Sequence, residues 1–277
     1  MPVQNQAMLM NLSVSKWTAR RFDKKATEAV HVQHHAKDAG RYNKLLIDAE
    51  ALKPINQAEA KLRDIHYRLT LPWGDNGDRL LPSKLYFEYT KQMREAKVGF
   101  ESAVQSFLPT YPTLKQDAHK RLGALYNPDD YPCTSDIAAK FSVRIEPAPV
   151  PDANDFRVDV GREDAELIKR DITQAVAARQ AEAIKDCYER VRELCERYSR
   201  TLRAKEPRIF DSMVDQAAEL AVLLPALNIA EDANLSSIAD DLKLLSESRP
   251  TSLRSSQWRR RDVADLAEAI LRKVPVQ

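Results

Sequence analysis

REDAELIKRDITQAVAARQAEAIKDCYERVRELCERYSRTLRA, residues 162–204, places apolar side chains on one face of a helix in steps of three and four. Such spacing predicts one helix of about forty residues and about 60 Å. The apolar positions are Ala165, Ile168, Ile172, Val176, Ala183, Cys187, Val191, Leu194, Tyr198 and Leu202.

The stripe has one polar interruption, where Arg179 and Gln180 occupy the position expected between Val176 and Ala183. On either side the spacing is close to a heptad seam. The interruption is either a register-setting site or a place where the helix bends or stops. A helix of this length exceeds what a compact domain needs. It is therefore either a spine for shorter helices or, along part of its stripe, a surface for self-association.

The rest of the chain predicts shorter helices and a small sheet. Residues alternate between apolar and polar from Met10 to Val14, from Phe141 to Ile145 and from Phe156 to Val160. The last two runs predict a hairpin, and the first predicts its third strand. The expected fold is mainly α, a long-helix bundle with a small three-stranded antiparallel sheet (α+β). Further helices are expected at 23–51, 55–69, 83–108, 113–125, 208–223, 232–247 and 258–273, within three consecutive regions, 1–126, 127–161 and 162–277.

The loop Leu71-Pro-Trp-Gly-Asp-Asn-Gly-Asp-Arg-Leu-Leu-Pro82 is bounded by prolines and holds two of the six glycines in the chain. Asn-Gly favours a tight turn with positive φ, so the loop is expected to hold one shape. A structural role is the simpler interpretation. The alternative is a site for a protein partner, with Trp73, Asp75, Asn76 and Arg79 as its residues.

Composition restricts the class of protein. The net charge is +2, and residues 1–44 hold eight Lys or Arg against three Asp or Glu, which leaves the remainder close to neutral. The chain has three cysteines, an odd number that cannot form a full set of disulfides, so a reducing compartment is expected. No apolar run is long enough to cross a membrane, and the N-terminus lacks the features of a signal peptide. We therefore expect a cytoplasmic protein with no membrane partner.

Catalytic motifs are not found. His31 and His35 are spaced like zinc ligands on a helix, but exposed histidines explain them more simply. Gly74-Asp75-Asn76-Gly77 matches neither a phosphate-binding loop nor a calcium loop. No nucleophile motif is present. The sequence thus predicts a protein that is not an enzyme, without cofactor or metal.

Two clusters combine aromatic rings with cations, as single-stranded nucleic acid requires for stacking and for phosphate contacts. The first lies at residues 16–25 and the second at the start of the last predicted helix, where three arginines oppose the helix dipole and should have partners. The alternative is a solvated basic face. The candidate residues are Lys16, Trp17, Arg20, Arg21, Lys24 and Lys25, and, beside Trp258, Arg259, Arg260 and Arg261.

Three segments carry a resemblance to a known family: Trp17–Lys25, Gly40–Leu46 and Leu71–Gly77. Over residues 10 to about 230 the chain resembles an uncharacterised family of phage and mobile-element proteins, defined only as a domain of unknown function. The resemblance implies a phage-genome setting, in some cases near ring-forming ATPases of the MoxR type. The family brings no catalytic residues to this sequence.

We therefore expect a non-enzymatic phage-type binding or assembly protein. It would act in the cytoplasm of the host cell, through self-association as a homo-oligomer or through another protein such as a ring ATPase. The alternative function is binding of single-stranded DNA through the basic and aromatic clusters.

Overall fold

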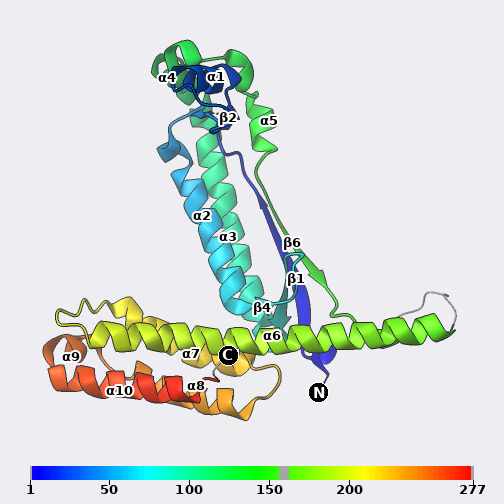
Figure 1. Cartoon of the computed structure of the whole chain (residues 1–277), viewed down its shortest axis with the longest axis vertical. Coiled ribbons are helices and arrows are strands. Elements are labelled where there is room, and N and C mark those ends of the chain that lie inside the picture. Colours follow the sequence, from blue (N-terminus) through cyan, green and yellow to red (C-terminus); the bar gives the residue numbers. More distant parts are fainter. Residues whose placement is uncertain (1, 156–161, 276–277) are drawn as a thin grey trace. The chain divides into compact units, whose positions relative to one another are not determined.

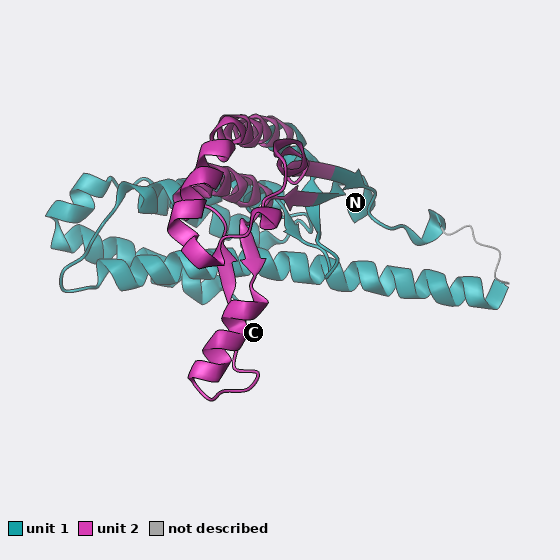
Figure 2. Cartoon of the chain, turned by 90° about the horizontal axis from the view of Figure 1, so that it is seen from above, with its two compact units in different colours: residues 1–11, 67–89, 146–277 teal, residues 12–66, 90–145 magenta. Residues whose placement is uncertain are grey.

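The computed structural model describes residues 2–155 and 162–275 of the chain. It is mainly α with small antiparallel sheets, as the sequence predicts (Figure 1). The chain forms two compact units (Figure 2). Unit 1 comprises residues 1–11, 67–89 and 146–277, and unit 2 comprises residues 12–66 and 90–145. The units are thus interleaved along the chain, whereas the sequence suggested three consecutive regions.

Helix α6 (Arg162–Leu202) organises unit 1 and is unbroken through Arg179 and Gln180. Helices α7 (Asp211–Leu227), α8 (Ala233–Ser246) and α10 (Gln257–Lys273) lie along its C-terminal half. Between α8 and α10, the short helix α9 (Pro250–Ser255) begins at a proline. Proline is tolerated in a first helical turn because the amide it lacks has no partner there.

The main sheet has the strand order β4-β5-β1-β6. Strands β1 (Ala7–Ser15) and β6 (Ser142–Ala148) correspond to two of the three predicted strands. The third, Phe156–Val160, lies outside the described residues. The other two strands are β4 (Leu71–Pro72) and β5 (Asp78–Pro82).

Within the described residues the sheet holds four strands where three were predicted, and the segment 71–82 is a hairpin rather than a loop alone. β5 pairs antiparallel with both neighbours, Leu80 lying opposite Leu9 on one side and Leu71 on the other. The prolines are compatible with strands here, because Pro72 lies on the edge strand and Pro82 ends β5.

Most of α2 (Lys53–Leu69) and α3 (Tyr86–Phe107) belongs to unit 2, together with α1 (Lys24–Gln33), α4 (Tyr111–Leu122) and α5 (Thr134–Ala138). Strands β2 (Arg20–Phe22) and β3 (Asn43–Leu45) form a two-stranded antiparallel sheet. Short 3₁₀ helices are Val3–Asn5 (η1), Ala49–Leu52 (η2), Ser83–Leu85 (η3), Leu108–Thr110 (η4), Gly123–Leu125 (η5), Pro128–Asp130 (η6) and Ala153–Asp155 (η7).

The helix predicted over 23–51 was wrong beyond Gln33. Asp23 does cap it, because its side chain accepts a 2.9 Å hydrogen bond from the amide of Ala26. His35 and Asp38 then adopt left-handed backbone conformations, with φ of 48° and 54°, which a helix cannot continue through. No helix in residues 2–155 or 162–275 has the length and apolar character needed to cross a bilayer.

Candidate interaction surface

The two halves of α6 differ in how much of their apolar stripe is covered. In the C-terminal half, Ala183, Cys187 and Val191 are fully buried within unit 1. In the N-terminal half, which we define as residues 162–182, Val176 alone is buried. Ala165, Ile168 and Ile172 remain part-exposed, and Leu167 beside them is 48% exposed. The N-terminal half thus presents an incompletely covered apolar face.

The polar interruption of the stripe lies where α6 meets the β4–β5 hairpin. A Cβ added to Gly74 would be 3.4 Å from the Nε atom of Arg179, so the arginine packs directly on the turn. Strand β4 also contacts α6. Arg179 therefore lies between the half of α6 that packs against α7 and α10 and the N-terminal half, whose apolar face is part-exposed.

Charged side chains flank the N-terminal half. Its first turns are acidic, with Glu163, Asp164 and Glu166, and basic residues follow, with Lys169 and Arg170. Lys169 forms an ion pair of 3.4 Å with Glu166 on the same helix. Exposed pairs of this kind contribute little to the stability of the fold, so these charges remain available to a partner.

The Trp-Gly hairpin places its predicted partner-binding residues in different environments. Trp73 is 1% exposed, and its Nε1 atom has no hydrogen-bond partner within the described part of the chain. Arg79 donates to the hydroxyl of Thr70 at 2.8 Å, and burial lowers the pKa of its guanidinium. Asp75 and Asn76 are exposed at the turn, where Asn76 hydrogen-bonds the carboxylate of Asp78.

The basic-aromatic cluster at residues 16–25 lies in unit 2, and its parts divide between core and surface. Trp17 is buried and its ring meets that of Tyr111 edge-on at 5.6 Å. Lys16 hydrogen-bonds Asn56 at 2.9 Å and pairs with Glu59. The cations that remain exposed are Arg20, Arg21, Lys24 and Lys25.

The second cluster lies in unit 1, at the start of α10. Arg260 donates to the carbonyl of Leu253 at 3.0 Å and thereby caps the end of α9. Arg259 lies 3.4 Å from Asp262, while Arg261 is exposed. Two of the three arginines thus have partners within this chain. Trp258 is 69% exposed.

The histidine pair does not share a helix face, because His31 lies in α1 and His35 follows the end of that helix with a φ of 48°. Among residues 2–155 and 162–275, no group of three or more His, Cys, Asp or Glu side chains is placed to hold a metal ion.

Unit 2 holds a buried ionic cluster that was not predicted from the sequence. Lys44 is 5% exposed and lies 2.9 Å from Asp23 and 2.7 Å from Asp130. Burial disfavours its charge, but hydrogen bonds to both carboxylates outweigh this and raise the pKa of Lys44. The available signal was a lone lysine directly before the apolar run Leu45-Leu46-Ile47.

Comparisons of the chain with family models, with curated proteins and with solved structures found no match.

Proposed function

We propose that this chain is a non-enzymatic assembly protein that pairs with a second copy of itself through the N-terminal half of α6. The observation that carries the proposal is the contrast along one unbroken helix. The same apolar stripe is fully covered in the C-terminal half and part-exposed in the N-terminal half. Contiguous apolar surface of this kind is typical of an interaction site. We also propose that the protein is encoded in a phage genome, as the resemblance implies.

The charge pattern supports an antiparallel arrangement. With Ile172 at the two-fold axis, the part-exposed Ile172 side chains of the two copies meet at the centre, and Ile168 of each copy lies one turn away. In the same register, the acidic first turns of the two copies, with Glu163, Asp164 and Glu166, lie at opposite ends of the pair. Separation of these like charges favours this pairing over the parallel one, in which they would align.

The expected complex is weak. The N-terminal half rises about 30 Å, and full burial of each large aliphatic side chain contributes about 1.5–3 kcal/mol. Association also costs about 4–15 kcal/mol, because two molecules lose translational and rotational freedom. Only the excess of the burial free energy over this cost contributes to affinity. We therefore expect a dimer that forms in the micromolar range or above.

Sedimentation velocity of the full chain tests the proposal over about a hundredfold concentration range. The wild-type chain should shift from monomer to dimer. Ile172→Glu should abolish the shift, because two carboxylates would meet at the centre of the pair. Gln174→Glu is the matched control: it adds the same charge on the opposite side of the helix and should leave dimerisation unchanged.

Two outcomes contradict self-association at this surface. One is a wild-type chain that stays monomeric throughout. It would favour the other occupant, a different protein such as a ring ATPase. The second is an Ile172→Glu variant that dimerises as the wild type does, which would place the contact elsewhere.

A second candidate function, binding of single-stranded DNA, is favoured by the four exposed cations of unit 2, Arg20, Arg21, Lys24 and Lys25. Fluorescence anisotropy with an oligothymidylate at increasing salt tests it. Replacing Arg20 and Arg21 with alanine should flatten the slope of log K against log salt by about 1.4, and a Lys61→Ala/Lys120→Ala variant should not. Binding without any salt dependence would contradict this function.

A further inference from the structure

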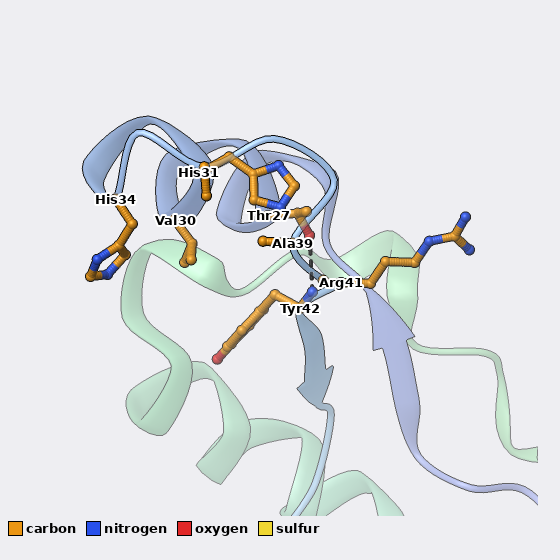
Figure 3. A pocket seen from close by; sticks show the side chains of 9 residues that line it. Thr27, Val30, His31, His34, Ala39, Arg41 and Tyr42 are labelled. Atoms are coloured by element: carbon orange, nitrogen blue, oxygen red, sulfur yellow. Dashed lines mark hydrogen bonds between the residues drawn. The ribbon is translucent and has the colours of Figure 1, made fainter.

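A pocket of about 330 Å³ lies in unit 2 between α1 and the loop that leads to β3 (Figure 3). We name it the Tyr42 pocket. Its walls are mostly carbon, from Val30, Ala36, Ala39 and the ring of Tyr42, and His31, His34 and Arg41 also line it. This volume is at the lower end of the range for ligand sites and has room for one large side chain.

The loop that forms the pocket is held at Tyr42 by hydrogen bonds to Thr27 and Asp23. The hydroxyl of Thr27, itself only 8% exposed, donates to the carbonyl of Asp23 at 2.7 Å and accepts from the amide of Tyr42 at 3.0 Å. The carbonyl of Tyr42 in turn accepts from the amide of Asp23 at 3.0 Å. These hydrogen bonds hold the backbone of Tyr42 in place. The position of the loop therefore does not depend on the Tyr42 ring, which forms one wall of the pocket.

The apolar walls remain accessible. Val30 is 46% exposed and Tyr42 is 41% exposed. Figure 3 shows Val30 and Ala39 directed toward the Tyr42 ring, with His34 and Arg41 extending away on opposite sides. Phe22 is also 46% exposed, and the guanidinium of Arg41 lies over its ring at 5.8 Å. Exposed apolar side chains gathered in this way mark an interaction surface.

The surroundings of the pocket are basic. Residues 20–42 contain six Lys or Arg and three Asp or Glu. Some of these charges are engaged within unit 2, since Asp23 pairs with Lys44 at 2.9 Å, Glu28 with Lys24 at 3.7 Å and Arg21 with Asp130 at 3.5 Å. The excess of positive charge is then carried by Arg20, Lys25, Lys37 and Arg41. An occupant complementary to this surface has an apolar group for the pocket and negative charge on both sides of it.

We propose that the Tyr42 pocket binds an acidic segment of another protein, which inserts one large aliphatic or aromatic side chain between Val30 and Tyr42. Its flanking carboxylates pair with the surrounding cations, Arg41 among them. The composition of the walls favours a peptide over a nucleic acid: a base presents polar edges that would lose their hydrogen bonds against carbon, whereas an apolar side chain loses none.

Selection from a random peptide display library on the full-length chain tests the proposal, with a Val30→Asp variant as the counter-selection target. The enriched peptides should carry one large apolar residue flanked by Asp or Glu. The best peptide, synthesised with a fluorescent label, should bind the wild-type chain at least tenfold more tightly than it binds Val30→Asp. An oligothymidylate is measured in parallel.

Val32→Asp is the matched control, because Val32 is 75% exposed on the same helix and does not line the pocket. It should bind the peptide as the wild type does, and circular dichroism should show all three chains folded. Three results would overturn the proposal: no enrichment, enriched peptides without acidic residues, or equal losses in Val30→Asp and Val32→Asp. An oligothymidylate that competes with the peptide and binds more tightly would assign the pocket to nucleic acid instead.

Discussion

The guanidinium of Arg190 donates a hydrogen bond of 2.7 Å to the carbonyl oxygen of Thr70, a residue 120 positions away in the sequence. The same side chain donates to the carbonyls of Tyr67 and Arg68, and Asp186 orients it at 2.8 Å. These are the carbonyls that the end of α2 leaves without partners inside the helix. Arg190 therefore supplies the C-terminal cap of α2 from α6.

We expect Arg190→Ala to lower the free energy of unfolding by about 2–3 kcal/mol, because it removes the charge-assisted hydrogen bonds to the carbonyls of Tyr67, Arg68 and Thr70. Arg190→Lys should recover little, since an ammonium group cannot reproduce the planar fork. Urea denaturation followed by circular dichroism measures both. The exposed Arg197 on the same helix is the control, and its replacement by alanine should cost under about 0.5 kcal/mol.

Lys44→Met should destabilise unit 2 by about 2–3 kcal/mol, because it leaves the carboxylates of Asp23 and Asp130 without their shared cation. The loss should be smaller than the 3–5 kcal/mol typical of deeply buried pairs, since the two carboxylates keep side-chain exposures of 12% and 10%. Denaturation at pH 7 measures it. An unchanged midpoint would show that the ion pairs contribute nothing net to stability.

The same cluster predicts a dependence on pH. The pKa of Asp23 is lowered, first by its hydrogen bond from the amide of Ala26 and then by Lys44. The stabilisation that follows from the lowered pKa is present above about pH 3.9, the pKa of Asp in the unfolded chain. It is lost as the pH falls through the pKa of Asp23 in the folded chain. The pKa of Lys44 is raised, so its contribution is complete below about pH 10.4 and is lost above it. The stability difference between wild type and Lys44→Met should therefore be constant between these limits and shrink outside them.

Gly74→Ala and Gly99→Ala should change stability in opposite directions. Gly74 has a φ of 91° and lies under Arg179, so a methyl group there is strained and should cost about 1–2 kcal/mol. Gly99 is inside α3 with nothing within 4 Å of an added Cβ, so alanine should stabilise the helix by about 0.5–1 kcal/mol. Thermal denaturation of the two variants checks the signs. A Gly74→Ala chain as stable as the wild type would contradict the positive φ at this turn.

The three cysteines should differ in reactivity. Cys133 is exposed, whereas Cys187 and Cys195 are fully buried, which raises the pKa of both thiols to about 12. Because the thiolate is the nucleophile, one thiol per chain should react rapidly with a disulfide reagent at neutral pH. Denaturant should release the other two, and Cys133→Ser should remove the fast phase. Rapid reaction of two thiols in the native chain would contradict the packing of α6.

The sequence by itself determined the long helix α6. In residues 162–202 the steps of three and four, without glycine or proline, make a helix the conformation that satisfies both backbone hydrogen bonding and burial. The polar pair at Arg179 and Gln180 does not interrupt it, because polar side chains are compatible with helical backbone. These are local properties, readable from neighbours four residues apart.

Only the tertiary structure decided the strand pairing and the exposed surface. Leu71–Pro72 carries turn signals locally and becomes a strand because β5 presents hydrogen-bonding groups to it. The helix expected over 23–51 ends at Gln33, because residues 43–45 pair with 20–22. Which half of the α6 stripe is covered depends on where α7 and α10 pack, and these contacts join residues far apart in the sequence. The spacing of apolar residues specifies which face of a helix is apolar. The rest of the fold determines how much of that face other elements cover.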